Sequence, residues 1–314
     1  MPDPLPRPEP ARGPVERPGR TASTGARPNP PPRLSVALTF DHDAISAEVN
    51  RGDGPVDISR GEFGPRVGVP RILALLDRHA IPATFFVPGH TAVTFPGSVS
   101  SIVAGGHELG CHGWAHEDLA SLEPLAERDV MARSYDTIGR AARGVMPKGF
   151  RAPYWSLSPQ TLDIATELGF RYDSSLMADD VRLSWVRVGD RHDVAKSELG
   201  TPGPLVEVPI SWSLDDFPHF EPGRRGTGPM SAASKVEQIW TDELRYAWAH
   251  EPGAVLTITM HPEVIGRGHR MLMLERFIAT ARELDGVVFE RLDTIVARWA
   301  AANARPEPTT TATV

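Results

Sequence analysis

The sequence predicts an α/β fold, with a mainly parallel sheet and helices on its outside, of a size that suits a β/α barrel. Short apolar runs rich in β-branched residues alternate along the chain with amphipathic stretches of helical period. No segment of linker composition interrupts this alternation between residues 34 and 300. Alternating strands and helices favour parallel strands, and in such folds reactive side chains collect at the carboxyl ends of the strands.

Both ends of the chain have the composition of tails. Residues 1–33 hold eleven prolines interspersed with arginines, and such a segment buries too little apolar surface to offset its ordering entropy. Residues 301–314 contain two prolines and a run of threonines. We therefore predict one folded domain over residues 34–300, between a disordered Pro/Arg-rich tail at 1–33 and a flexible tail at 301–314.

The elements follow from periodicity and from turn residues. Strands are predicted at Leu34–Phe40, Ile81–Val87, His107–Gly110, Leu205–Ile210, Ala254–His261 and Val287–Phe289. Helices are predicted at Arg66–His79, Glu123–Ala142, Ser158–Leu168, Ser231–Ala249, His269–Leu284 and Leu292–Ala302. The pair Ser158-Pro159 is typical of a helix start, and Gly169 of a helix end. The stretches Ala44–Gly68 and Trp212–Phe220 are expected to form loops over the mouth of the barrel.

Composition excludes several classes of function. A net charge of -7 lacks the basic excess of a nucleic-acid-binding protein. No run approaches the roughly 20 apolar residues that span a bilayer, so no membrane partner is expected. The single cysteine, Cys111, cannot form an internal disulfide, and no apolar signal segment is present, so we predict a cytoplasmic protein. Assembly into a homo-oligomer is possible, but no stretch of the sequence identifies an interface.

The first polar cluster is Asp41-His42-Asp43, directly after the apolar run LSVALTF. In an extended segment residues i and i+2 point the same way, so Asp41 and Asp43 can face one cavity while His42 faces the opposite side. A metal would let one carboxylate ligate while the other stays a base. The alternative is an ordinary polar strand end that forms a turn.

The second cluster contains His112 and His116, whose H-x-x-x-H spacing brings two imidazoles to one side of a helical turn or a tight loop. The alternative is a chance pair of surface histidines, which can have the same spacing. A zinc protease would need glutamate after the first histidine, where this chain has Gly113, so that class is disfavoured. Cys111 is better read as a small buried hydrophobe than as a ligand.

Two further motifs complete the pattern. In GFRAPYW, Arg151 could hold a carboxylate ionised and oriented, or could lie in a solvated surface turn. In TITMHP, His261 ends an apolar strand and is either a general acid or a structural histidine.

The order Asp-x-Asp, H-x-x-x-H, R-x-P-Y and a late strand-end histidine resembles the polysaccharide deacetylase family, also called the NodB homology domain or carbohydrate esterase family 4. The resemblance covers residues 34–300. It implies a distorted β/α barrel of about seven parallel strands. It also implies a divalent metal, most often zinc, held by Asp43, His112 and His116.

The same resemblance implies the other roles. Asp41 would be the general base, Arg151 would steady Asp41, the backbone N–H of Tyr154 would help to form the oxyanion hole, and His261 would be the general acid. We further expect Trp212 to line the acyl pocket. Asp215 and Asp216 are expected to hydrogen-bond the substrate, with solvated loop carboxylates as the alternative.

The expected function is metal-dependent hydrolysis of a non-peptide carbon–nitrogen bond, removing N-acetyl groups from an amino-sugar substrate with metal-activated water. Extracellular sugar deacetylases of the family carry two adjacent aspartates. The Asp-His-Asp spacing of this chain instead resembles the branch of the family with peptidoglycan deacetylases and cyclic imide hydrolases. A cytosolic hydrolase of small cyclic imides is therefore an alternative. A non-catalytic glycan-binding module is another.

Overall fold

A computed structural model describes residues 32–221 and 230–305 of the chain. The tails predicted at 1–33 and 301–314 lie mostly outside these residues. Arg33 belongs to the folded part, because its Nε donates to the carbonyl oxygen of Trp248 at 2.8 Å. Residues 301 and 302 still belong to the last helix.

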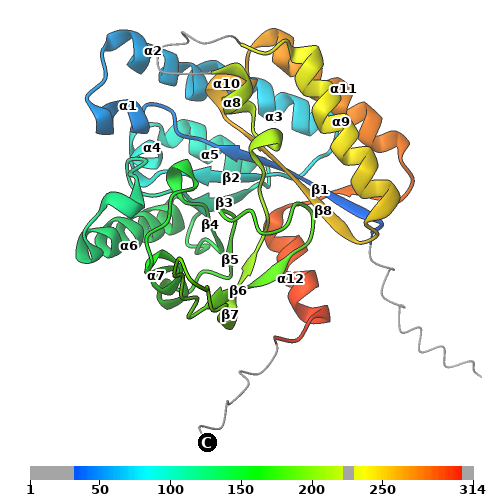
Figure 1. Ribbon diagram of the computed structural model, residues 1–314. Helices are drawn as coiled ribbons and strands as arrows, with labels where there is room; N and C mark the ends of the chain where they lie inside the picture. The colour runs from blue at the N-terminus through cyan, green and yellow to red at the C-terminus, as the bar shows by residue number, and fades with distance from the viewer. Residues whose placement is uncertain (1–31, 222–229, 306–314) are drawn as a thin grey trace, which may run out of the picture. The chain divides into compact units, whose positions relative to one another are not determined.

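The sheet has nine strands within the described residues and follows the order β6-β7-β5-β4-β3-β2-β1-β8, with β9 paired to β1 (Figure 1). Neighbouring strands are parallel except β6 and β7. The strands are β1 (Leu34–Asp41), β2 (Thr84–Val87), β3 (Glu108–Cys111), β4 (Gly149–Phe150), β5 (Tyr172–Asp173), β6 (Ser184–Val188), β7 (Thr201–Glu207), β8 (Ala254–Met260) and β9 (Val287–Phe289).

This architecture confirms the predicted distorted β/α barrel, with two differences. The sheet has more than the seven strands expected, because β4 and β5 contain two residues each and leave no periodicity to detect. The strand path is open between β6 and β8, so the sheet is a half-barrel. The predicted strand Leu205–Ile210 begins four residues earlier, at Thr201.

Strand β1 carries the alternation that places the site. Val36, Leu38 and Phe40 belong to the large core between the sheet and its outer helices, whereas Ala37 belongs to the smaller core on the other face. Residues of alternate parity point to opposite faces, so Asp41 shares the inner face with Ala37. The last helix, α12 (Leu292–Ala302), contributes Leu292, Ile295 and Val296 to that inner core.

Apart from α12, which packs on the inner core, the predicted helices lie outside the sheet, and several shorter helices accompany them (Figure 1). The predicted helices appear as α3 (Val69–Arg78), α6 (Pro124–Ala141), α7 (Thr161–Leu168), α9 (Ala233–His250), α11 (Gly268–Glu283) and α12. The others are α1 (Ser46–Arg51), α2 (Pro55–Phe63), α4 (Gly89–Thr94), α5 (Pro96–Ala104), α8 (Asp216–Phe220) and α10 (Pro262–Ile265). Short helical turns occur at η1 (Gly64–Gly68), η2 (Leu119–Ser121), η3 (Pro153–Trp155) and η4 (Trp212–Leu214).

Two loop predictions are therefore wrong in conformation. Residues 44–68 form α1, α2 and η1, and residues 212–220 form η4 and α8. Each of the two segments consists of short helical pieces that bury only a few residues. Neither segment therefore carries a long apolar stripe. The helix α7 begins at Thr161, three residues after its predicted start, while the Ser158 hydroxyl accepts from the Gln160 N–H and donates to the carboxylate of Glu127. Gly169 ends α7 as predicted, with φ of 92°.

Close approach of η1 to α10 requires glycine. A Cβ on Gly68 would lie 2.1 Å from the carbonyl oxygen of Pro262, a backbone atom that cannot rotate away. We expect Gly68→Ala to lower the free energy of unfolding by about 1–3 kcal/mol, as overpacking does, measured by urea denaturation. Gly97→Ala in α5 is the control, because its Cβ would meet nothing within 4 Å. Equal losses of unfolding free energy in the two variants would contradict the steric requirement for glycine at position 68.

Candidate active site

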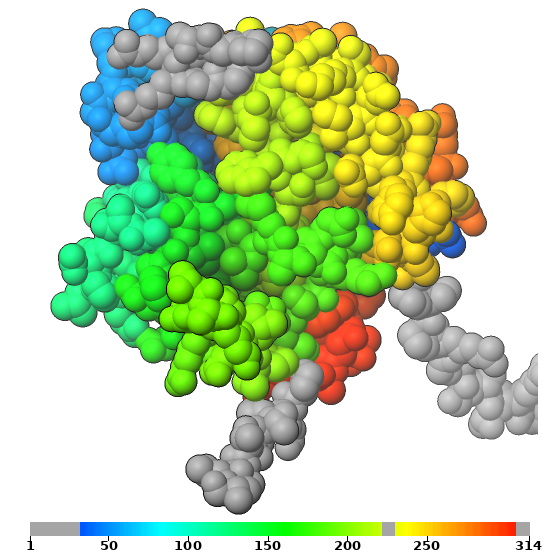
Figure 2. All heavy atoms as spheres, in the orientation of Figure 1, coloured from blue at the N-terminus to red at the C-terminus, as the bar shows by residue number. Residues whose placement is uncertain are grey.

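The carboxyl ends of β1, β3, β4 and β8 surround one cavity of about 270 Å³. Figure 2 shows the surface above it, where the blue segment of α1 and α2, the green segment around η3 and the yellow-green segment of η4 and α8 meet. All the predicted site residues line this cavity except Arg151 and Asp216, which contact lining residues from behind. The tertiary fold therefore brings together residues that lie as far apart in the sequence as Asp41 and His261.

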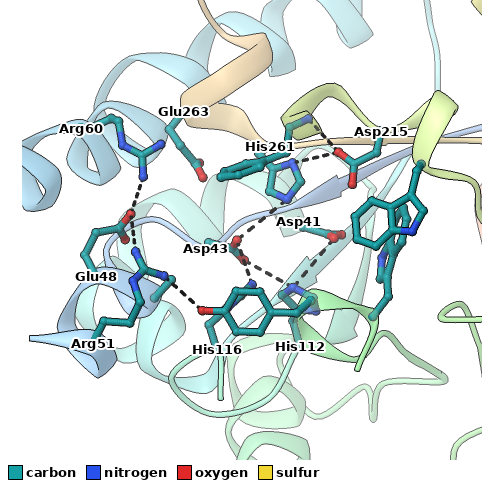
Figure 3. A pocket seen from close by; sticks show the side chains of 15 residues that line it. Asp41, Asp43, Glu48, Arg51, Arg60, His112, His116, Asp215, His261 and Glu263 are labelled. Carbon is teal, nitrogen blue, oxygen red and sulfur yellow. Dashed lines mark hydrogen bonds and ion pairs between the residues drawn. The ribbon is translucent and has the colours of Figure 1, made fainter. Parts of the chain in front are cut away.

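Asp43, His112 and His116 form a compact buried triad (Figure 3). His112 Nε2 lies 3.5 Å from Asp43 Oδ1, and His116 Nε2 lies 3.3 Å from Asp43 Oδ2. The sequence left a helical turn or a tight loop open for the histidines. The structure shows a tight loop, with φ of 67° at Gly113 and 58° at His116.

The donor set of this triad fits a divalent cation such as zinc. His112 Nδ1 donates to the carbonyl oxygen of Arg151 at 2.8 Å, so neutral His112 presents the lone pair of Nε2 to the triad. Burial lowers the pKa of His112, and burial with the nearby His261 lowers the pKa of His116 to about 3. Among the described residues Asp43 Oδ1 has no hydrogen-bond partner. Two neutral imidazoles and a carboxylate are ordinary zinc ligands.

Asp41 is held as a carboxylate. Burial alone would raise its pKa, but the charge of Arg151, with that of His261, holds the pKa below its usual range. Arg151 Nη1 donates to Asp41 Oδ1 at 2.7 Å and to Thr39 Oγ1 at 3.0 Å, and its other nitrogens donate to Ser174. Because these contacts occupy Oδ1, the other oxygen of Asp41, Oδ2, faces the cavity. His42, between the two aspartates, points the other way, as predicted, and contacts Ser98.

His261 is held in the opposite charge state. Its Nδ1 donates to Asp216 Oδ1 at 2.8 Å, and its backbone N–H donates to the same carboxylate. Burial would lower the pKa of His261, but Asp216, Asp215 and Asp43 raise it well above its usual value. The ring is thus an imidazolium whose Nε2 faces the cavity, 4.0 Å from Asp43 Oδ2.

Asp216 does not fit its predicted contact with substrate. Its side chain is 0% exposed and both its oxygens accept hydrogen bonds from His261, so it has no access to the cavity. It orients His261 instead. Asp215, Asp216 and His261 are close enough to hold a cation themselves, but these hydrogen bonds already account for their arrangement.

The remaining predicted residues form the cavity mouth. Trp212 packs against Trp155, with ring centroids 4.2 Å apart and ring planes inclined by 42°. Tyr154 has a φ of 57°, which turns the chain at the cavity wall, and its ring lies edge-on to His116. Asp215 lines the cavity and also caps α8 by accepting from the Phe217 N–H; burial and the charge of Asp216 raise its pKa to about 7.

Sequence reasoning missed four charged residues of the cavity, which are Glu48, Arg51, Arg60 and Glu263. The first three lie in the segment expected to be a loop. Glu263 follows His261, at the strand end, by two residues. That spacing was the one available signal that Glu263 could lie in the cavity. Burial raises the pKa of Glu263 well above its usual range.

Asp41 and His261 flank the buried Asp-His-His group at the open end of the α/β half-barrel, an arrangement that fits the class of amide hydrolases. The chain belongs to the polysaccharide deacetylase family. The family model for polysaccharide deacetylase matches residues 29–172. A peptidoglycan deacetylase of Helicobacter pylori is 34% identical over 270 residues, which is 81% of this chain and 92% of that protein.

Two further relatives agree. A peptidoglycan-N-acetylglucosamine deacetylase of Bacillus cereus is 35% identical over 138 residues, covering 44% of this chain and 42% of its own length. The crystal structure of a candidate polysaccharide deacetylase from Mycobacterium smegmatis superposes with a TM-score of 0.76 at 35% identity, covering 89% of this chain and 96% of that chain. No helix within residues 32–221 and 230–305 is long and apolar enough to cross a membrane.

Proposed function

We propose that this protein is a zinc-dependent deacetylase that removes the N-acetyl group of an amino sugar. The observation that carries the proposal is the placement of Asp41, bonded to Arg151, and His261, bonded to Asp216, around the Asp43, His112 and His116 triad. Relatives named as peptidoglycan and N-acetylglucosamine deacetylases support an N-acetylated sugar as the substrate class.

The residues divide the reaction between them. Asp43, His112 and His116 would hold the zinc, which when bound makes water a better nucleophile and polarises the amide carbonyl. Asp41 Oδ2 accepts the proton of the attacking water, while Arg151 keeps Oδ1 in place. His261 Nε2 donates a proton to the departing nitrogen. Water and the acetamide thus become acetate and a free amine.

Three residues would position the substrate. The backbone N–H of Tyr154 would donate to the developing oxyanion, a contribution of roughly 3–4 kcal/mol for a well-placed donor. Trp212, which packs against Trp155, would line the pocket for the acyl group. Asp215 is placed to accept from the substrate amide, because it lines the cavity beside His261. Asp216 acts through His261.

Product analysis tests the proposal. Zinc-loaded protein is incubated with N,N′-diacetylchitobiose and with succinimide, and proton NMR follows acetate and ring-opened half-amide, with Asp41→Asn as the blank. We expect acetate from the disaccharide. Half-amide without acetate would replace the proposal with the cyclic imide hydrolase, and no product from either substrate would favour a glycan-binding module. The cytoplasmic location and homo-oligomeric assembly considered from the sequence stay predictions.

The pH dependence of turnover follows from the charge states. A base with a lowered pKa and an acid with a raised pKa give a kcat/KM plateau across neutral pH, with the acid limb set by Asp41 and the alkaline limb by His261. Asp216→Asn removes the carboxylate that raises the pKa of His261. We expect the alkaline limb to move to lower pH by about 1–3 units.

The measurement is kcat/KM for the disaccharide against pH. Asp163→Asn, an exposed carboxylate on α7, is the control and is expected to keep the wild-type profile. An unmoved alkaline limb in Asp216→Asn would remove His261 as the group that sets it.

A further inference from the structure

Two buried carboxyl groups lie close to Arg151 and have no role in the reaction described above. Asp173 ends β5 and Glu207 ends β7, and these parallel neighbours place the two residues side by side (Figure 1). Asp173 is 0% exposed and Glu207 is 4% exposed. Within residues 32–221 and 230–305, neither is among those that line the cavity. Burying two adjacent carboxyl groups opposes folding, so we expect this pair to serve a purpose other than stability.

The pair carries one negative charge at neutral pH. Burial and the charge of Asp173 raise the pKa of Glu207 well above its usual range, whereas burial raises the pKa of Asp173 to about 6. Glu207 is therefore neutral while Asp173 is ionised. A neutral carboxyl group beside a carboxylate donates a hydrogen bond to it, so one proton joins the two groups.

The two carboxyl groups hold the segment that follows β5. The Ser175 N–H donates to Asp173 Oδ2 at 3.1 Å and to Glu207 Oε1 at 3.2 Å. The Leu176 N–H donates to Glu207 Oε1 at 3.0 Å. The Ser175 hydroxyl donates to Asp173 Oδ1 at 2.8 Å and accepts from the Ala152 N–H at 2.9 Å. The pair therefore fixes this segment and, through one hydroxyl group, the backbone that follows β4.

The same segment holds Arg151. Its Nε donates to the carbonyl oxygen of Ser174 at 3.1 Å, and its Nη2 donates to the Ser174 hydroxyl at 3.0 Å. The remaining nitrogen, Nη1, donates to Asp41 Oδ1 at 2.7 Å. Because a guanidinium group is planar and rigid, two nitrogens fixed on Ser174 set the direction in which the third meets Asp41.

We propose that Asp173 and Glu207 are positioning residues that hold the Arg151 guanidinium at the angle that aligns Asp41 with the attacking water. This inference rests on the proposed function and deepens it by naming the residues that orient its base. The effect passes through Ser174, whose position the pair fixes and whose two oxygens bind the guanidinium. A misplacement on the order of 1 Å at a reacting group costs about 100-fold in rate, so a displaced base lowers turnover.

Substitutions of Glu207 test the pair. Glu207→Ala is expected to lower kcat for N,N′-diacetylchitobiose about 10- to 100-fold while KM stays within about twofold, because Glu207 lies outside the cavity. Glu207→Gln keeps an acceptor for the two backbone N–H groups and a donor for Asp173, so its loss in kcat is expected to be at most about threefold. Glu283→Ala, an exposed residue of α11, is the control. Unchanged kcat in Glu207→Ala would overturn the proposal.

A double-mutant cycle tests the route through Arg151. In the Arg151→Met background no guanidinium links Ser174 to Asp41, so Glu207→Ala is expected to lower kcat by less than about twofold further. A general loss of packing would instead lower kcat by the same factor in both backgrounds, and that result would contradict a positioning role.

Hydrogen exchange gives a readout that needs no turnover. The Nε–H of Arg151 is buried and bonded to the Ser174 carbonyl oxygen, so it exchanges slowly with solvent in the wild type. In NMR spectra of protein with isotope-labelled arginine, its resonance is the one that Arg151→Met lacks. We expect its exchange to become about 10-fold faster or more in Glu207→Ala and to stay close to wild type in Glu207→Gln.

The two measurements separate this inference from the proposed function. Unchanged exchange in Glu207→Ala, or equal acceleration in Glu207→Ala and Glu207→Gln, would overturn the positioning role. The expected exchange pattern in a protein that releases no acetate from the disaccharide would instead overturn the proposed function alone.

Discussion

Asp41→Asn is expected to lower kcat on the N-acetyl sugar about 100- to 10,000-fold while zinc content stays at the wild-type level. The asparagine side chain keeps the shape and an acceptor for the Arg151 guanidinium, which contacts Oδ1 at 2.7 Å in the wild type. It has no carboxylate to take a proton from water. Activity falls because the base is lost, whereas the triad of Asp43, His112 and His116 is untouched.

Single-turnover and steady-state kinetics measure this effect, with zinc determined by mass spectrometry on the same samples. Asp136→Asn, an exposed carboxylate on α6, is the control and is expected to behave as wild type. Full activity in Asp41→Asn would eliminate it as the base. Loss of zinc together with activity would instead make Asp41 a ligand, since its Oδ2 lies 3.8 Å from His112 Nε2.

His112→Ala is expected to lose zinc and activity together. Removing this imidazole leaves Asp43 and His116 as the two protein ligands, and we expect zinc affinity to fall more than about 100-fold. Dialysis against a zinc buffer followed by metal analysis measures it. Thermal unfolding with and without zinc gives a second readout, because an ion that binds only the native state raises the Tm of wild type.

His79→Ala is the matched control, because His79 contacts Glu275 outside the cavity. It is expected to keep the wild-type zinc content. Unchanged zinc stoichiometry in His112→Ala would remove this residue from the ligand set. A native circular-dichroism spectrum in the variant separates ligand loss from unfolding, since burial of His112 makes its removal a packing change as well.

The fold class and the long elements could be predicted from the sequence because they depend on local periodicity. Strand β1 is buried along its whole length and α3, α6, α9 and α11 each carry an apolar stripe, so each leaves a signal over eight or more residues. Several of the elements that were missed are short. The strands β4 and β5 exist because β3 and β7 lie beside them, and no two-residue segment specifies a strand alone.

The site was partly predictable for a related reason. Asp41, Asp43 and His261 follow apolar strands in the sequence, and strand ends of a parallel sheet meet at one edge, so their convergence could be expected. The bond between His261 and Asp216 joins residues 45 positions apart, and nothing local in the sequence predicts it. Asp216 was therefore expected at the substrate, whereas it lies behind the histidine.

By itself the sequence determined the α/β class and the family, because these depend on patterns along the chain, and through that resemblance it predicted the triad as the metal ligands. Only the tertiary structure decided the charge states of Asp41 and His261, since each is set by a buried partner from a distant segment. It also decided that Glu48 and Glu263 share a cavity wall, although they are 215 positions apart in the chain. Burial and charge proximity are properties of the packed chain, and they determine which side chains can move a proton and which can bind a substrate.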